Sequence, residues 1–358
     1  MLEYFFGFLI LLGVLIFVHE CGHFIVAKLA DVKVLKFSLG FPPAMITRKW
    51  GETEYILSWI PLGGYVKLLG EDPDSKEEIP PEDLPRAFTS KSLSARAAII
   101  LAGPLSNYIL AGLLLCAGYV AGWPVLASDI GKVLDGSPAA LAGLKTGDKV
   151  VAIDGESVWR WDDMRSIIEK SAGKDLALTI ERDGRVMDVH VTPSISDQKD
   201  LFGDSVGRIG VAPSGQTVKL GFVASIYEGL RFTGYLTKLV LTTLAKVVRG
   251  DISAKALSGP ITIVQASGES LKAGLFSFIF LLSYISINLA IINLLPVPIL
   301  DGGHLLFFLI EAIIRKPVTG RVREVAVHAG LLFIVLLMVL VFYNDITRIV
   351  TRGWTLQP

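Results

Sequence analysis

Four stretches of the chain are apolar over lengths that could cross a lipid bilayer. A helix needs about 20 mostly apolar residues to span the hydrocarbon core. The four predicted spans are residues 1–30, 96–122, 273–314 and 328–343. The third is longer than the others and contains Pro296 and Pro298. A regular helix cannot continue through these prolines, so we expect a break there. The pattern predicts an α-helical membrane protein with about four transmembrane helices.

The segments between the spans are more polar and differ from one another. Residues 31–95 contain alternating aromatic and β-branched positions with Gly and Pro breaks, which predicts a membrane-associated β-hairpin region followed by a linker. We expect this region to be re-entrant on the cytoplasmic side. Residues 194–272 form a connector whose amphipathic part, 219–248, carries too many charges for a comfortable span. We expect that part to be a helix lying at the membrane interface.

Residues 128–193 have the pattern of a soluble α/β module, with an amphipathic helix and two strands that meet at Asp183-Gly184. The run SPAALAGLKTGDKVVAIDG, residues 137–155, resembles a PDZ domain of the bacterial protease type. The resemblance implies an inserted α/β PDZ domain that binds a peptide strand or a chain end by β-augmentation. By analogy, the binding edge would lie near residues 130–133.

Composition limits the classes of function. Of 358 residues, 52% are hydrophobic, and 34 basic residues balance 34 acidic ones, so nothing favours nucleic-acid binding. Cys21 and Cys116 both lie in apolar runs, which is typical of small buried residues and not of a disulfide framework. The N-terminus lacks the basic flank and cleavage site of a secretory signal, so we interpret it as a retained membrane helix.

The first span carries the strongest chemical signal, His19-Glu20-Cys21-Gly22-His23. On an α-helix, side chains four residues apart point nearly the same way, so both imidazoles can reach one metal ion. Glu20 lies one step round the helix, where it can take a proton from water, as in the H-E-x-x-H zinc hydrolases. Ionisable groups within a membrane span are costly and indicate function.

Asp301 is the candidate third ligand. It follows the proline break, where an open backbone at membrane depth requires protein or a wet cavity to satisfy it. Two histidines and one carboxylate leave a fourth position for water, the arrangement of a catalytic zinc site. Zinc is inferred from the type of ligand. His304 is predicted to face the polar interface.

Asn107 is a second polar residue at membrane depth, in the run Gly103-Pro104-Leu105-Ser106-Asn107. It could make a hydrogen bond between helices, or contact a bound peptide or a residue of the metal site. The sequence leaves both open.

Basic residues are frequent in 31–95 and in the link between the last two spans. The positive-inside tendency places both in the cytoplasm, with the PDZ domain and both termini extracytoplasmic. The metal site would then lie towards the cytoplasmic face.

Taken together, the His19–His23 motif, the run 103–107, the stretch 293–301 and the PDZ module resemble the site-2 protease family, the M50-type intramembrane zinc metalloproteases, in the branch of the regulator of sigma-E protease. Members of that branch often carry two PDZ modules, and here we find one.

The resemblance implies regulated intramembrane proteolysis in a bacterial inner membrane. Zinc would be held by His19, His23 and Asp301, Glu20 would be catalytic, and Asn293 would hold the substrate backbone. The expected partners are the lipid bilayer and single-span membrane proteins of the anti-sigma-factor type, and possible further substrates are remnant signal peptides.

Two other functions are compatible with membrane-embedded histidines. A zinc transporter would require a polar path through several helices, and it leaves the PDZ module unexplained. A catalytically inactive PDZ scaffold would not need a complete set of ligands and base.

Overall fold

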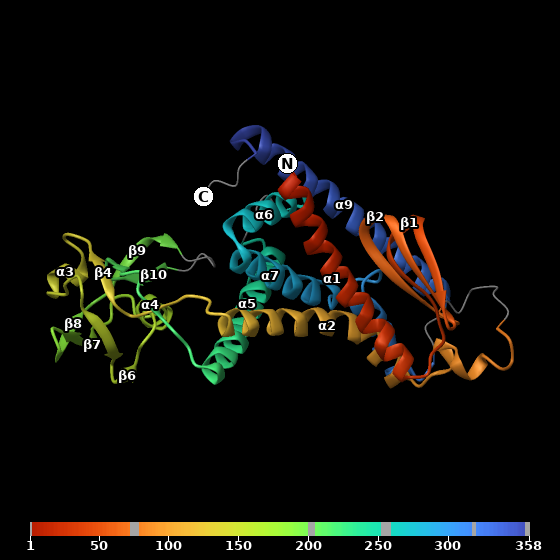
Figure 1. The fold of residues 1–358 in the computed structure, drawn as a ribbon, viewed down its shortest axis with the longest axis horizontal. Helices are drawn as coiled ribbons and strands as arrows, with labels where there is room; N and C mark the ends of the chain where they lie inside the picture. The colour runs from red at the N-terminus through yellow and green to blue at the C-terminus, as the bar shows by residue number, and fades with distance from the viewer. Residues whose placement is uncertain (1, 72–78, 200–204, 252–258, 317–319, 355–358) are drawn as a thin grey trace. The chain divides into compact units, whose positions relative to one another are not determined.

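The computed structural model describes residues 2–71, 79–199, 205–251, 259–316 and 320–354. The chain divides into two compact units, Met1–Gly118 with Tyr227–Pro358, and Tyr119–Ile226 (Figure 1). The first is a helical unit that includes a β-sheet, and the second is built mainly from short strands.

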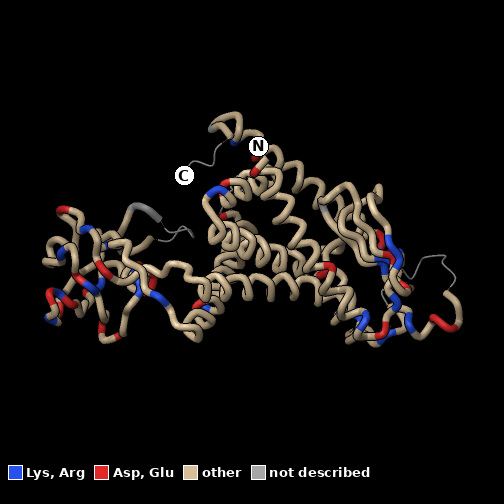
Figure 2. Tube along the Cα trace, in the orientation of Figure 1, with Lys and Arg blue, Asp and Glu red and all other residues tan. Residues whose placement is uncertain are grey.

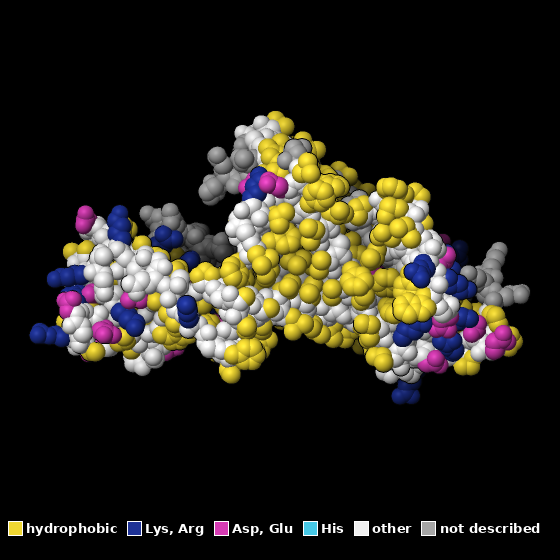
Figure 3. All heavy atoms as spheres, viewed as in Figure 1, with side chains coloured by type: hydrophobic (Ala, Val, Ile, Leu, Met, Phe, Trp, Pro, Cys, Tyr) yellow, Lys and Arg dark blue, Asp and Glu magenta, His cyan; other side chains and the backbone are white. Residues whose placement is uncertain are grey.

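Four helices of the first unit are long and apolar enough to cross a membrane: α1 (Leu2–Leu29), α2 (Leu93–Val120), α7 (Leu275–Asn293) and α9 (Gly320–Arg352). Figure 2 shows long stretches without acidic or basic residues in the helical unit, and the charged residues of α9 lie near its two ends. Figure 3 shows hydrophobic side chains gathered over the same unit. Large apolar side chains remain exposed along α9 in particular, as expected of a lipid-facing helix. The predicted class of membrane protein is confirmed.

The predicted third span is two helices, α7 and α8 (Asp301–Ile314), separated by residues 294–300. Glycines allow the chain to fold back tightly here. A Cβ on Gly302 would lie 2.3 Å from the carbonyl oxygens of Leu294 and Leu295, and one on Gly303 would lie 2.3 Å from that of Val297. The break therefore places Asp301 at the first turn of a new helix.

Residues 34–68 form two long, bent antiparallel strands, β1 (Val34–Trp50) and β2 (Thr53–Leu68). Phe37 pairs with Val66 on one side and with Tyr55 on the other, so the first half of β1 lies between the two halves of β2. The hairpin is thereby folded into four short strands whose outer edges are residues 44–50 and 64–68. Gly40 permits the bend, because its φ of 91° is a conformation that other residues rarely adopt.

Two helices follow the second unit. The predicted amphipathic helix corresponds to α5 (Phe222–Arg249). The helix α6 (Pro260–Ala273) was not predicted, and all but its last residue lie within the predicted connector 194–272. It packs closely on α1, since a Cβ on Gly7 would lie 2.9 Å from the carbonyl oxygen of Ser267. Asp345 of α9 caps its first turn by accepting from the backbone N–H groups of Gly259 and Thr262 at 3.1 and 3.0 Å.

The second unit is the inserted α/β PDZ domain. Its elements are β3 (Val125–Leu126), β4 (Ile130–Val133), α3 (Pro138–Leu141), β5 (Lys149–Ile153), β6 (Glu156–Ser157), α4 (Trp161–Glu169), β7 (Leu176–Arg182), β8 (Arg185–Val191), β9 (Ser194–Lys199), β10 (Ser205–Arg208), β11 (Val211–Pro213) and β12 (Thr217–Val218). A sheet of order β6-β5-β7-β8 covers a core that includes Val150, Met164 and Leu178.

The domain continues past the predicted boundary of residue 193. The strand β11 pairs with β4 and β12 pairs with β3, which joins the C-terminal segment to the start of the domain. Ile209, 2% exposed, belongs to the same apolar core. Residues 194–199 and 205–218 are therefore part of this unit and not of a connector.

Candidate active site

The two histidines of α1 point to one place. His23 donates from Nδ1 to the backbone carbonyl of Ile99 on α2 at 2.8 Å, so its Nε2 is unprotonated unless the ring is charged. That Nε2 lies 3.2 Å from Nε2 of His19. The bond to α2 thus fixes the tautomer and the direction of the ring, as in many metal-ligating histidines.

Asp301 completes the cluster from the first turn of α8. Its Oδ2 lies 3.3 Å from Nε2 of His19, and its Oδ1 lies 3.6 Å from Nε2 of His23. All three side chains are less than one-fifth exposed. Within the described ranges, these three residues form the one group of His, Cys, Asp and Glu side chains close enough to hold a metal ion.

The spacing of the donor atoms fits zinc. Tetrahedral zinc with bonds of about 2.0–2.1 Å keeps its ligand atoms about 3.4 Å apart. The observed separations of 3.2, 3.3 and 3.6 Å lie near that value, the last two being measured to different oxygens of the Asp301 carboxylate. Two imidazole nitrogens with one carboxylate are also the donor set of catalytic zinc sites that keep a fourth position open.

Small residues let α2 approach these histidines. A Cβ on Gly103 would lie 2.2 Å from Nε2 of His23 and 2.8 Å from Cε1 of His19. A Cβ on Gly22, in the middle of the motif, would lie 2.3 Å from the carbonyl oxygen of Ala102. In the sequence, Asn107 and not Gly103 stands out in the run 103–107, because the contact of Gly103 with the imidazoles depends on the packing of α1 against α2.

Glu20 lies between the ligands and the sheet. Its side chain is largely buried, and its carboxyl interacts electrostatically with His19 and Asp301. The second half of β2 packs directly on it, because a Cβ on Gly64 would lie 2.9 Å from Cγ of Glu20. A carboxylate thus lies beside the three candidate ligands and next to the edge strand 64–68.

The remaining candidates lie outside this cluster. Asn107 is 1% exposed on α2, and its side-chain oxygen has no hydrogen-bond partner among the described residues. Asn293 is the last residue of α7, at the start of the break. His304 lies one turn after Asp301, and its Nδ1 is 3.2 Å from a guanidinium nitrogen of Arg323 on α9.

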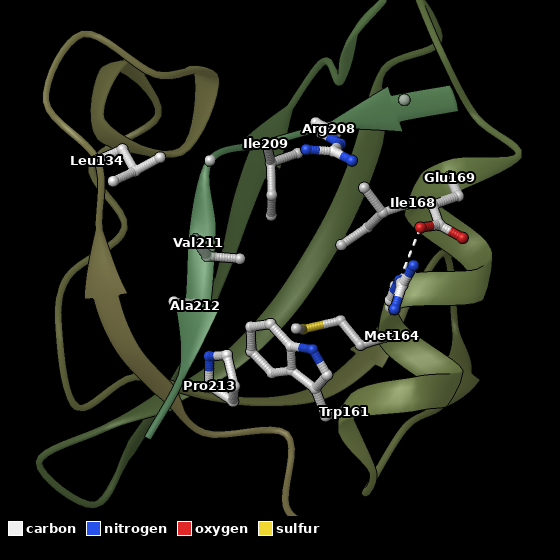
Figure 4. A pocket seen from close by; sticks show the side chains of 13 residues that line it. Leu134, Trp161, Met164, Ile168, Glu169, Arg208, Ile209, Val211, Ala212 and Pro213 are labelled. Atoms are coloured by element: carbon white, nitrogen blue, oxygen red, sulfur yellow. Dashed lines mark hydrogen bonds and ion pairs between the residues drawn. The ribbon is translucent and has the colours of Figure 1, made fainter. Parts of the chain in front are cut away.

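The PDZ domain has a groove of its own, with a volume of about 410 Å³. Figure 4 shows Met164 and Ile168 of α4 on one side and Ile209 and Val211 on the other. The predicted binding edge, residues 130–133, pairs along one side with β11. The groove lies between β11 and α4.

Comparison with known proteins gives a match to the family model "Peptidase family M50" over residues 7–337. A putative zinc metalloprotease of Agrobacterium fabrum is 36% identical, covering 96% of this chain and 95% of that protein. The zinc metalloprotease RasP of Geobacillus kaustophilus is 33% identical, covering 97% and 98%. The regulator of sigma-E protease RseP of Salmonella typhimurium is also 33% identical, covering 96% and 98%.

Among solved structures, the PDZ domain of an SdrC-like protein from Listeria innocua covers 24% of this chain and 92% of its own, with 18% identity and a TM-score of 0.21. The decisive matches are those that extend over nearly the whole chain, across the α1 motif and the segment that leads into α8. The chain belongs to peptidase family M50 and is a membrane-embedded zinc metalloprotease.

Proposed function

We propose that His19, His23 and Asp301 hold the zinc ion and that Glu20 is the catalytic base. The observation that carries this assignment is the meeting of three ligand side chains from α1 and α8, whose donor atoms lie within 4.8 Å of one another. Zinc bound there supplies a Lewis acid that polarises a peptide carbonyl and makes water more acidic.

In this assignment Glu20 moves the proton. Its carboxylate accepts a proton from the water that attacks the scissile carbonyl, and then delivers that proton to the departing amide nitrogen. Its burial against β2 excludes bulk water and holds the carboxylate in place. Each proton taken from water is therefore returned to the new amine, and the base is regenerated.

The substrate segment binds in an extended form along residues 64–68 of β2. Amides within a transmembrane helix are tied up in internal hydrogen bonds, so the segment must unwind before it is cut. A sheet edge offers replacement hydrogen bonds to the unwound backbone. Gly64 brings this edge into contact with the Glu20 side chain, which supports cleavage of a strand bound there.

Asn293 and Asn107 are the proposed substrate-binding side chains. Asn293 lies where α7 gives way to the break that leads to Asp301. The side-chain oxygen of Asn107 is buried without a partner among the described residues, which supports an acceptor reserved for a bound peptide.

The substrates are transmembrane segments of single-span membrane proteins. The regulator of sigma-E protease among the relatives supports an anti-sigma-factor type, with remnant signal peptides as a further class. The PDZ groove binds a peptide or a chain end, and together with α5 it admits substrates whose outer domain has been removed. The protein lies in a bacterial inner membrane, with the metal site towards the cytoplasm and the PDZ domain and termini outside.

The test is cleavage of a model single-span substrate in detergent or liposomes by the wild type and by Glu20→Gln. Loss of a general base costs about 10²- to 10⁴-fold in rate. The variant should be slower by that factor while it keeps its zinc, and Glu54→Gln on β2 serves as a control that keeps full activity. Equal cleavage by Glu20→Gln would rule out the proposed base. Zinc flux through liposomes that Glu20→Gln leaves unchanged would instead support a transporter.

A further inference from the structure

An ion pair joins α2 to α8 away from the candidate zinc site. Arg96 of α2 donates to Glu311 of α8 through both terminal nitrogens, at 2.6 and 3.4 Å. The two side chains are only 15% and 22% exposed. The guanidinium also lies over the ring of Phe308, with Cζ 5.1 Å from the centroid. This bidentate contact restricts the relative position of the two side chains more than an exposed ion pair between a lysine and a carboxylate would.

The two helices that it joins carry opposite sides of the metal site. The helix α2 receives the His23 hydrogen bond at Ile99 and lies against both imidazoles at Gly103. The helix α8 begins with Asp301. Ten residues separate Asp301 from Glu311, a rise of about 15 Å along the helix. A shift of α8 along or around its axis would therefore move Asp301 away from the histidines.

Other polar and close contacts of α8 lie near its first turn, where Gly302 and Gly303 pack on the break and His304 contacts Arg323 of α9. The helix α8 follows the break at 294–300, so the chain before it does not continue a helix. On the side of Arg96, Phe308 packs in an apolar cluster with Ile99 and Ile100 of α2, a contact that is not directional. A bidentate ion pair adds a directional contact that the apolar cluster lacks.

We propose that the Arg96–Glu311 pair is a positioning element of the zinc site, which holds α8 on α2 so that Asp301 stays within bonding distance of the metal. The inference rests on the proposed assignment of Asp301 as a ligand. Neither residue touches the substrate or the metal. Their loss acts through the position of α8, as loss of outer partners does at other zinc sites, where affinity falls by about 10- to 100-fold.

The test measures zinc affinity, by competition with a chromogenic chelator, on the purified full-length protein in detergent. Arg96→Ala and Glu311→Ala should each weaken zinc binding by about 10-fold or more. The double variant should be no weaker than either single one, because the two side chains act through one contact. Lys33→Ala is the matched control. It breaks a partly buried pair with Asp83 at 2.5 Å, which involves neither helix, and should leave the affinity unchanged.

Unchanged zinc affinity in both single variants would overturn the inference, and so would losses that add in the double variant. If the alanine variants do not fold, the same cycle is run with Arg96→Lys and Glu311→Gln, which keep a donor and an acceptor. Absence of zinc binding in the wild type would instead refute the proposed metal site, so the two failures are distinguishable.

Discussion

At the scale of single residues, Gly103 is where α2 presses on the candidate ligands. An added methyl group would lie 2.2 Å from Nε2 of His23, closer than atoms can approach, so the imidazole must move. Overpacking of this kind costs about 1–3 kcal/mol. We predict that Gly103→Ala weakens zinc binding by about 5- to 100-fold, since each 1.4 kcal/mol is a factor of ten.

The matched control is Gly112→Ala on the same helix. There the new methyl group would meet Thr233 at 3.8 Å, which is ordinary contact, so zinc affinity should not change. Competition with a chelator measures both variants. Equal affinity in Gly103→Ala and the wild type would mean that the histidines are held less tightly by α2 than these distances imply.

A substitution at Gly64 should distinguish the role of the catalytic base from that of the metal ligands. A methyl group there would lie 2.9 Å from Cγ of Glu20 and 2.8 Å from the carbonyl oxygen of Ser38. Because neither atom belongs to a candidate ligand, we predict that Gly64→Ala leaves zinc content intact. It should lower kcat by about 10-fold or more, up to the 10²- to 10⁴-fold that loss of a general base costs. Gly13→Ala, with no atom within 4 Å, is the control. A loss of zinc in Gly64→Ala would argue against this division of roles.

The candidate base and metal ligands could be predicted from the sequence because each of them stands out from its neighbours in the chain. His19, Glu20 and His23 are polar side chains in an apolar helix, and Asp301 follows a proline break, so each is conspicuous where it stands. The structure brings the three candidate ligands to within 4.8 Å. The partners that orient them were not predictable in the same way. The carbonyl of Ile99 has no sequence signature, because any residue could supply it.

At the scale of elements, the folded hairpin is tied to the chain beyond it by charge. Arg86 donates to both carboxylate oxygens of Glu52 at 2.7 and 2.8 Å, and Lys28 of α1 adds a third contact. The hydrogen bonds from Arg86, with help from Lys28, lower the pKa of Glu52 from 4.5 to about 2. The carboxylate therefore favours the folded hairpin wherever it is ionised.

The sign of the pH dependence follows from that lowered pKa. The stabilisation by Glu52 is complete above pH 4.5 and is lost as the pH falls through about 2. We predict that the stability difference between the wild type and Glu52→Gln shrinks over this window, by the order of 1 kcal/mol expected of a partly exposed pair. Thermal unfolding in detergent from pH 2 to 6 measures it. A difference that stays constant with pH would show that the ion pair does not stabilise the fold.

Elements that depend on distant partners were harder to predict. Alternation in residues 31–68 indicated strands, but not that the first half of β1 pairs with both halves of β2. The helix α6 has a polar sequence with Gly268 in its middle, so its pattern alone does not favour a helix. It is stabilised by close packing on α1 and by the cap from Asp345, a residue 86 positions after Gly259.

At the scale of the whole molecule, the boundary of the PDZ domain was also hard to predict, because it depends on partners that are distant in the sequence. The sequence predicted residues 128–193, because the strand pair that meets at Asp183-Gly184 ends there. The strands β11 and β12 are short, and they join the domain by pairing with β4 and β3, which lie about 80 to 90 residues earlier in the chain. Local patterns predicted the domain, whereas its limits are set by long-range pairing.

The two units have separate apolar cores, which predicts that they can be destabilised separately. Leu178 is fully buried in the PDZ core, and Leu15 is fully buried in a cluster of the helical unit. Truncation of a buried leucine costs about 2–5 kcal/mol. Leu178→Ala should therefore lower the unfolding temperature of residues 119–226 while zinc affinity stays unchanged, and Leu15→Ala should affect the helical unit instead. Calorimetry with limited proteolysis locates each transition. If Leu178→Ala weakened zinc binding as much as it destabilised the PDZ domain, the two cores would have to unfold as one cooperative unit, contrary to their separate packing.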